Sequence, residues 1–314
     1  LFDYRVNLQT PIWLLIDAES RARKIYAEPP SAAVAQADLH SLDGPLPDPR
    51  GVPLEGRFTG HPRRDYYKFG GALLMAGYNE QALPYLEEML RRTPDNPKAL
   101  FAVGRIHLQA RRLNQARQAL QRAVAIDPKL TGGWNELGGV EVEAGNLKEA
   151  LSLYERALSI EPESIYILLN IGETQEKSGA AAEAERTYRH ALELDPRSGD
   201  AANALGLLLA KQGHTAEARK LFETAISLKR DDSSAINNLG VLFLNIGQPN
   251  DAIAAFQYGI RMAPNDDALY LNLARVWVRL GNREKAKDVM RDLLERKPGH
   301  PVAQRALREL DTQP

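Results

Sequence analysis

The 314-residue chain contains no cysteine. This absence excludes a disulfide framework, a thiolate metal site, a cysteine nucleophile and a CxxC redox pair within the chain. The six histidines are scattered, and no two of them have the spacing of metal ligands. The motifs GxSxG and HExxH, a Walker loop and a GxGxxG after a strand are also missing, as are N-x-S/T sequons. We therefore predict no enzyme activity, no metal site and no cofactor.

A strong charge bias and long apolar runs are missing as well. Lys plus Arg number 40 and Asp plus Glu number 41, a balance that gives no electrostatic footprint for nucleic acid or an anionic membrane. No apolar run reaches the roughly 18 residues that a membrane-spanning helix needs. No secretory signal opens the chain, which begins at Leu1 rather than Met and so agrees with a fragment or a processed chain.

Prolines recur at a fixed interval along most of the chain. The interval is about 34 residues, or twice that where Arg230 stands in place of one member: Pro94, Pro128, Pro162, Pro196, Pro264 and Pro298. This period defines seven consecutive units, which start at residues 63, 97, 131, 165, 199, 233 and 267. Position numbers below are counted from the start of each unit.

Other positions of the unit keep the same phase. Position 8 is Gly in six units and Ala274 in the last, position 20 is always Ala, and position 15 is Gly except for Arg111. Position 24 is large: Leu86, Leu120, Tyr154, Tyr188, Phe222, Phe256 and Met290. Apolar positions 4, 7 and 10 share one face of a first helix, which the glycine at position 15 ends; the proline ends a second helix. Each unit is predicted to be an antiparallel helix pair that buries its faces by stacking on its neighbours.

These positions resemble the tetratricopeptide repeat family over residues 63–300, about three quarters of the chain. The resemblance implies a mainly α fold, a right-handed α-solenoid or superhelix whose first helices line a concave groove. Residues 301–314 are expected to form a C-terminal cap helix and tail.

The front of the chain has a different pattern. Residues 43–62 contain five prolines and four glycines, which predicts a linker. Residues 12–17 and 22–28 predict two strands, and residues 31–42 a helix with Ser31 as its N-cap. One interpretation of these residues is a structural hairpin and helix that pack against the first repeat. The other is the remnant of a larger domain.

Thr10-Pro11 followed by strand, turn, strand and helix resembles the C-terminal half of a thioredoxin-like domain, although Ser20 stands where that family usually has glycine. Residues 1–42 are thus expected to be a partial thioredoxin-like ββα segment without its redox half. Joined to a repeat array, the segment resembles the C-terminal region of bacterial FG-GAP/UnbV-type proteins. That resemblance implies export to the cell envelope, with a cytoplasmic location as the alternative.

In the tetratricopeptide repeat family, positions 2, 5, 6, 9, 12 and 13 tend to face the groove. Positions 5 and 6 here place at least one amide on each of units three to seven: Asn135, Asn170, Asn203, Asn237, Asn238 and Asn272. Each asparagine offers a donor and an acceptor to a peptide backbone. O-GlcNAc transferase has a comparable asparagine ladder, which this array resembles. Alternatively, several of these side chains hold contacts between neighbouring repeats.

Two further groups of side chains are candidates for partner contact. An aromatic and basic patch is expected at the N-terminal end of the groove: Tyr67, Phe101, Arg105 and Tyr166. Arg275 and Arg279 lie one turn apart on the seventh first helix, where they meet either an acidic partner or solvent. The acidic residues Glu141, Glu143, Glu173 and Glu176 are expected on solvated helix surfaces.

The sequence therefore predicts a non-enzymatic scaffold that binds a protein or an extended peptide in a concave groove. Nucleic acid partners and direct membrane insertion are not expected. Two alternatives remain: self-association through stacked repeats into an oligomer or filament, and a substrate-selecting arm of an enzyme whose catalytic domain lies outside this chain.

Overall fold

The computed structural model of the chain describes residues 13–16, 22–26, 71–74, 76–230 and 232–312. The chain divides into two compact units, residues 1–94 and residues 95–314. In the first unit, β1 (Trp13–Ile16) and β2 (Ala22–Tyr26) pair in antiparallel fashion, with a register shift between Leu15 and Ile16. These two strands were predicted; the predicted helix at residues 31–42, the linker at 43–62 and Tyr67 lie outside the described residues.

The rest of the described first unit is helical. Residues 71–74 form a helical turn, Gly77 has a φ of +80° and α3 (Asn79–Arg92) follows. The boundary between the units falls at Pro94, near the end of the first predicted repeat. Two strands do not by themselves distinguish a thioredoxin-like remnant from another hairpin, so that interpretation stays a prediction.

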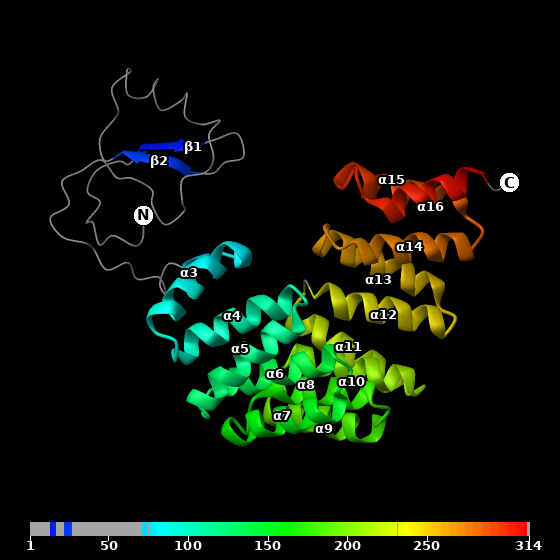
Figure 1. Ribbon diagram of the computed structural model, residues 1–314. Helices are drawn as coiled ribbons and strands as arrows, with labels where there is room; N and C mark the ends of the chain where they lie inside the picture. The colour runs from blue at the N-terminus through cyan, green and yellow to red at the C-terminus, as the bar shows by residue number, and fades with distance from the viewer. Residues whose placement is uncertain (1–12, 17–21, 27–70, 75, 231, 313–314) are drawn as a thin grey trace, which may run out of the picture. The chain divides into compact units, whose positions relative to one another are not determined.

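The second unit consists of helix pairs followed by a terminal helix (Figure 1). Its first helices begin at the predicted starts of the repeats: α4 (Pro97–Gln109), α6 (Thr131–Glu143), α8 (Ile165–Lys177), α10 (Gly199–Lys211), α12 (Ser233–Asn245) and α14 (Asp267–Arg279). Its second helices are α5 (Leu113–Ile126), α7 (Leu147–Ile160), α9 (Ala181–Leu194), α11 (Thr215–Leu228), α13 (Pro249–Met262) and α15 (Arg283–Arg296). The terminal helix is α16 (Pro301–Thr312).

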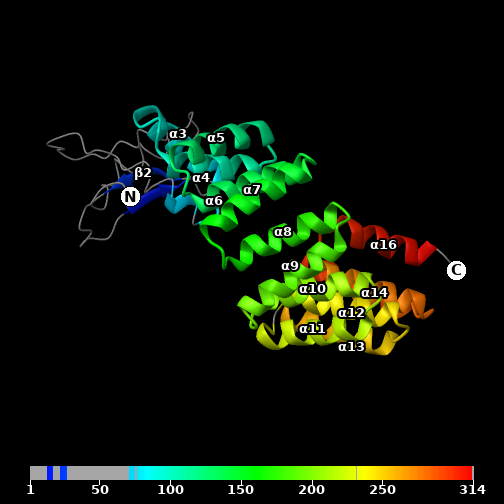
Figure 2. The ribbon, with the colours of Figure 1, turned by 90° about the horizontal axis from the view of Figure 1, so that it is seen from below.

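The first helices form the inner layer of this unit. Each first helix contacts the next one directly, from α4 with α6 to α12 with α14, whereas no comparable contact joins neighbouring second helices among the described residues. Figure 2 shows α11 and α13 on the outer side of the layer formed by α10, α12 and α14. Because the inner helices are spaced more closely than the outer ones, the stack curves with the first helices on its concave side.

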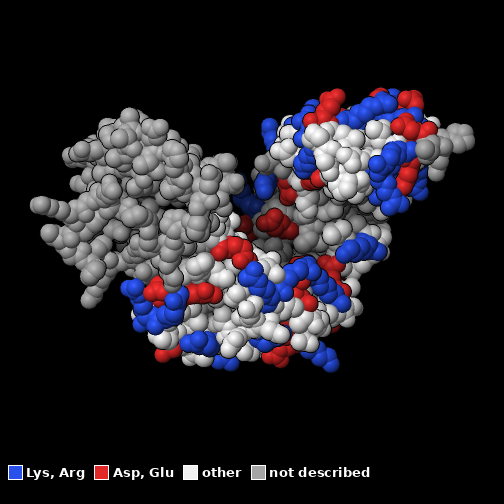
Figure 3. Space-filling view, turned by 45° about the horizontal axis from the view of Figure 1, so that its top comes forward, with Lys and Arg blue, Asp and Glu red and all other residues white. Residues whose placement is uncertain are grey.

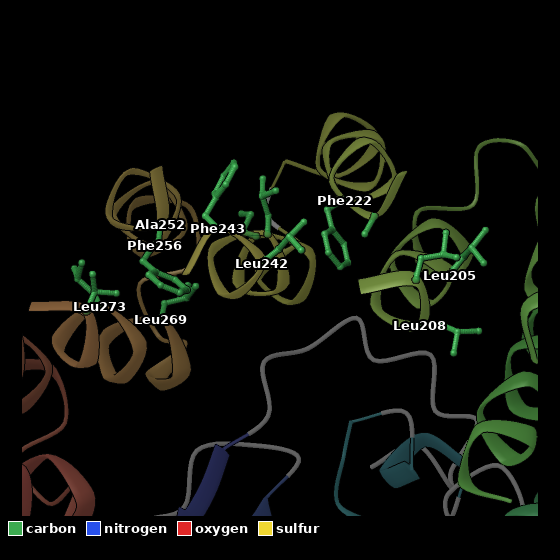
Figure 4. Close-up of a cluster of buried hydrophobic side chains, with 14 of the residues drawn as sticks. Leu205, Leu208, Phe222, Leu242, Phe243, Ala252, Phe256, Leu269 and Leu273 are labelled. Carbon is green, nitrogen blue, oxygen red and sulfur yellow. The ribbon is translucent and has the colours of Figure 1, made fainter. Parts of the chain in front are cut away.

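Glycine sets the close approach within each pair. A Cβ on Gly240 would lie 2.5 Å from Cε1 of Phe256, and one on Gly138 would lie 2.5 Å from Cε1 of Tyr154. The position-24 side chain therefore packs directly on the backbone of its own first helix, where an added Cβ would clash. In the last pair Ala274 faces the unbranched Met290 instead, and both are buried. Figure 4 shows how these rings join into a core that continues from one pair to the next, with Phe256 beside Leu269 of α14.

The predicted left-handed ends of the first helices are present. Six glycines at position 15 have φ between +74° and +86°, and Arg111 has a φ of +55°. Arg111 still donates its N–H to the carbonyl of Leu108 at 2.9 Å, and Arg112 donates to His107 at 2.8 Å, the hydrogen bonds that close a helix C-terminus. Arg111 thus adopts the glycine conformation with a side chain that disfavours it.

Exchanging the glycine of one pair tests the close approach. Overpacking costs about 1–3 kcal/mol, which exceeds the helix-propensity gain of about 1 kcal/mol. We therefore expect Gly240→Ala to lower the free energy of unfolding. Adding Phe256→Met, which copies the Ala274–Met290 pair, should recover part of that loss. The readout is a urea double-mutant cycle; additive effects of the two changes would contradict the packing argument. Gly299→Ala is the control, because no atom lies within 4 Å of the added Cβ.

Arg111→Gly is expected to stabilise the chain by about 1 kcal/mol, because a left-handed residue with a Cβ stores about 1–2 kcal/mol of strain and glycine loses more backbone entropy on folding. The lost Arg111–Glu143 ion pair, at 3.5 Å, is exposed and contributes little. Thermal melting measures the change. Arg111→Ala keeps the Cβ and should not stabilise; if it stabilises as much as glycine does, backbone strain is not the cause.

Candidate interaction surface

The inner face of the second unit consists of positions 2, 5, 6, 9, 12 and 13 of the first helices. On α10, α12 and α14 these positions are exposed or half-buried, while positions 3, 4, 7, 8 and 10 are buried. The family pattern predicted this face from sequence. In the space-filling view of Figure 3 this side of the repeats is hollowed, and both acidic and basic side chains are visible within the hollow.

The asparagines on this face pair across the boundary between repeats. Nδ2 of Asn170 donates to Oδ1 of Asn135 at 2.8 Å. The same bond joins Asn238 to Asn203 at 2.9 Å and Asn272 to Asn237 at 2.6 Å. Each pair links position 6 of one repeat to position 5 of the repeat before it. All six asparagines thus hold the inter-repeat contacts that were the alternative interpretation, and contact with a peptide stays a prediction.

Pairing does not use up every polar group of these amides. An asparagine offers two N–H donors and an oxygen with two lone pairs, and one bond takes one site from each partner. Nδ2 of Asn237 and Oδ1 of Asn238 bond to no other group within the described residues. Both side chains are half-buried, whereas Asn135 is only 5% exposed. Asn170 on α8 is half-buried as well, so Asn135 is the only one of the six amides that is withdrawn from solvent.

The predicted aromatic and basic patch is brought together in part. Cζ of Arg105 lies 5.7 Å from the ring centroid of Phe101 on the same helix, α4. Nε of Arg105 lies 3.6 Å from the carboxylate of Glu136, and burial of Glu136 raises its pKa while Arg105 opposes that rise. Tyr166 lies two first helices further on, on α8, and is 61% exposed. Tyr67 lies outside the described residues.

Glu141 is a correction to the expectation of a solvated surface. It is 6% exposed, and Arg117 of the previous repeat donates to both of its oxygens, at 2.6 and 3.2 Å. Nδ2 of Asn146 adds a bond at 2.7 Å. The hydrogen bonds from Arg117 lower the pKa of Glu141 against the opposing effect of burial. Sequence periodicity missed this pair because a charged residue replaces an apolar one at position 11, where Leu209 and Phe243 are found in later repeats.

Most acidic side chains on the inner face already have cationic neighbours. Glu176 accepts from Lys211 at 2.8 Å and from the buried hydroxyl of Tyr188 at 2.9 Å. Burial and the Glu176 carboxylate raise the pKa of Tyr188 far above its ordinary value. Glu143 lies 3.5 Å from Arg111, and Glu173 lies 3.2 Å from Lys177. The acidic middle of the face is thus largely neutralised from within the chain.

A second concavity lies on the outer side. It has a volume of about 460 Å³ and is lined mainly by apolar residues of α11, α12 and α13, including Phe243, Ala254 and Tyr258. Figure 4 shows Phe243 between α11 and α13. Glu223 at its edge is already paired with Arg219 at 2.7 Å. This recess therefore offers mainly hydrophobic contact, with Ser227, Arg230 and Asp251 as the other polar residues of its lining.

Among the described residues, no group of three or more His, Asp and Glu side chains is placed so that it could hold a metal ion. No helix of this part of the chain combines the length and apolar character needed to cross a membrane.

The stacked helix pairs with a repeated inner-face geometry define an α-solenoid of tetratricopeptide repeats. The profile of the family described as the cilia and flagella-associated protein 70 C-terminal domain matches residues 63–309, and the chain belongs to this family. A tetratricopeptide repeat array, predicted from the regular spacing of the prolines, is thereby confirmed.

Individual proteins resemble this chain either over a short segment or over most of its length at low sequence identity. The TPR repeat-containing protein PA0015 of Pseudomonas aeruginosa is 42% identical over 53 residues, 17% of this chain and 50% of that protein. The chain thus spans about half the length of this curated relative. A tetratricopeptide repeat protein from Parabacteroides merdae has a TM-score of 0.62 at 18% identity, covering 79% of this chain and 98% of that one. The APC/C hetero-tetramer Cut9–Hcn1 gives a TM-score of 0.59 at 19% identity, covering 78% and 48%. These likenesses show the fold.

The Arg117–Glu141 pair gives a pH-dependent prediction. The pKa of Glu141 is lowered on folding, so its contribution is present above the unfolded pKa of about 4.3 and is lost as the pH falls through the folded value. We expect Glu141→Gln to cost about 1–2 kcal/mol at pH 7, with the difference from the native chain narrowing below about pH 4. Urea unfolding at several pH values measures this. Glu155→Gln, an exposed change on α7, is the control; an unchanged gap at low pH would contradict the assignment.

Proposed function

We propose that this chain is a non-enzymatic scaffold whose inner face binds an extended peptide or a segment of a partner protein. The observation that carries the proposal is the row of amides on α10, α12 and α14, which keep donors and acceptors after pairing with one another. Pairing fixes the amides in place before a ligand arrives. A bound segment would therefore lose conformational freedom while the protein loses little.

Self-association through stacked repeats and a role as the arm of an enzyme, the two alternatives from the sequence, have less support than peptide binding. End-to-end stacking would need a further helix to pack on α16, where Arg308 occupies position 8, the position that is glycine or alanine in the seven units. A side chain of this size opposes the close approach seen at Gly240. A role as the substrate-selecting arm of an enzyme would require a catalytic domain elsewhere in the gene product. The thioredoxin-like origin of residues 1–42 and export to a bacterial cell envelope are proposals of the same kind, which the full-length gene would test.

Site-specific photo-crosslinking tests the proposed face without depending on stability. A benzophenone amino acid at Leu207, on the inner face of α10, should form covalent adducts with another protein in the source cells. The same residue at Gln257, exposed on the outer side of α13, should form few. We expect at least a tenfold difference in adduct yield. Equal yields at the two positions would contradict binding at the inner face.

Removing one whole amide pair sharpens this test. In Asn203→Ala/Asn238→Ala both partners are lost, so neither leaves the other unsatisfied in a half-buried site. The adduct at Leu207 should fall about tenfold, while melting temperature stays close to that of the native chain. Lys220→Ala on the outer helix α11 is the matched control and should leave the adduct unchanged.

A further inference from the structure

The inner face changes character between its two halves. At positions 9 and 12, the helices α10, α12 and α14 carry apolar side chains that are not fully buried: Leu207, Ala210, Val241, Leu244 and Val278. Leu207 is 37% and Val278 is 45% exposed. The same positions on α4 and α8 include the charged residues Arg105, Glu173 and Glu176. An apolar strip thus runs beside the amide row, and it begins at α10.

The far end of this strip is cationic. Arg275 and Arg279 lie one turn apart on α14 at positions 9 and 13, and both are exposed. Nη1 of Arg275 donates to Oδ1 of Asn272 at 3.1 Å. In the described part of the chain neither arginine lies within ion-pair distance of a carboxylate, in contrast to the paired acidic residues of α6 and α8. Guanidinium groups bind carboxylates in a bidentate manner, so this end suits an acidic group.

The spacing of the strip limits the shape of its ligand. Packed helices lie about 8–10 Å apart, so the position-12 residues Ala210, Leu244 and Val278 repeat at about that interval from α10 to α14. A polyproline II segment rises about 3.1 Å per residue and therefore advances about 9.3 Å in three residues. A fully extended strand brings same-side residues back at intervals of about 6.6 Å, which fits less well. A helix does so at intervals of about 5.4 Å, which is further still from the spacing of the strip.

The amides favour the same conformation. A polyproline II segment has no internal backbone hydrogen bonds, so its N–H and C=O groups are free to bond Asn237 and Asn238. A helical ligand has already satisfied its own backbone groups along most of its length.

We propose that the inner face of α10, α12 and α14 binds an extended, polyproline II-like peptide segment with an apolar residue at every third position and a carboxylate-bearing end over Arg275 and Arg279. This inference rests on the proposed function and names the class of its ligand. The apolar residues of the peptide lie on the position-12 row of Ala210, Leu244 and Val278, which Leu207 and Val241 widen at position 9. The peptide backbone bonds the remaining amide groups.

Synthetic fluorescein-labelled peptides of about twelve residues test the spacing. The main probe has leucine at every third position, separated by proline and glutamine, with two aspartates at one end; two versions place the aspartates at the N- or the C-terminal end. Control peptides of the same composition place leucine at every second position or in a helical heptad pattern. Fluorescence anisotropy with the full chain should show at least one period-three probe binding about tenfold more tightly than both controls.

Variants of the chain test the cationic end. Replacing the aspartates of the probe by asparagine should weaken binding about tenfold, and Arg275→Glu/Arg279→Glu should abolish that preference. Lys148→Glu/Lys220→Glu makes the same charge change at exposed positions of the outer helices α7 and α11. This variant should keep the preference for the aspartate-bearing probe. Thermal melting confirms that both double variants are folded.

Several results would overturn the inference. Equal binding of the three spacings, tightest binding of the heptad peptide, or no binding of any peptide at 1 mM (roughly −4 kcal/mol, the weak limit of specific recognition) would each refute the proposed ligand. An aspartate preference that survives the arginine changes would refute the role of Arg275 and Arg279. If the peptides fail while crosslinking at Leu207 still captures a partner, the proposed function stands and this ligand class is wrong; if crosslinking also fails, both are wrong.

Discussion

The contact between a small residue at position 8, glycine in every pair of the second unit but the last, and a large side chain at position 24 sets the spacing of the helix pairs. Where position 8 has no Cβ, the ring at position 24 lies directly on the first helix, as Phe256 does on Gly240. This brings the two helices of a pair close together and leaves their other faces apolar. Those faces can be buried only against the next pair, so stability grows along the stack by nearest-neighbour contacts. The curvature, the inner face and the regular spacing of that face follow from this one repeated contact.

Charged and polar side chains modify the stack where its apolar pattern is interrupted. Glu141 replaces an apolar residue at position 11 and is stabilised by Arg117 from the neighbouring repeat. The paired asparagines join neighbouring repeats at positions 5 and 6. At the boundary between the fourth and fifth units these two positions are instead the partly buried hydrophobic residues Leu169 and Ala204. Such bonds add specificity to the alignment of repeats, because a misaligned neighbour would leave a half-buried polar group unsatisfied. The amides of the inner face therefore have a structural role that is compatible with binding, since each keeps capacity for a further bond.

The inner face has two regions that differ in the kind of side chain they expose. From α4 to α8 the face carries several charged side chains beside apolar ones such as Leu108 and Val142, and most of its carboxylates lie close to cations such as Lys211. From α10 to α14 it is amide-rich and apolar, and it ends in two arginines without carboxylate partners among the described residues. The second region is the one where a ligand would gain most by binding, because its hydrophobic area and its charges are not already used within the chain.

The helix pairs, their repeat period and the left-handed ends at glycine could be predicted from the amino-acid sequence, and the family pattern indicated the inner face. These are local properties, because helical periodicity, backbone conformation and side-chain size are set within each repeat. Only the folded structure shows that Asn135 is buried and bonded to Asn170, that Glu141 is paired with Arg117, and that apolar positions of α10, α12 and α14 align into a strip. These depend on contacts between residues 24 to 35 positions apart, and a single repeat contains no information about which side chain its neighbour will place opposite it.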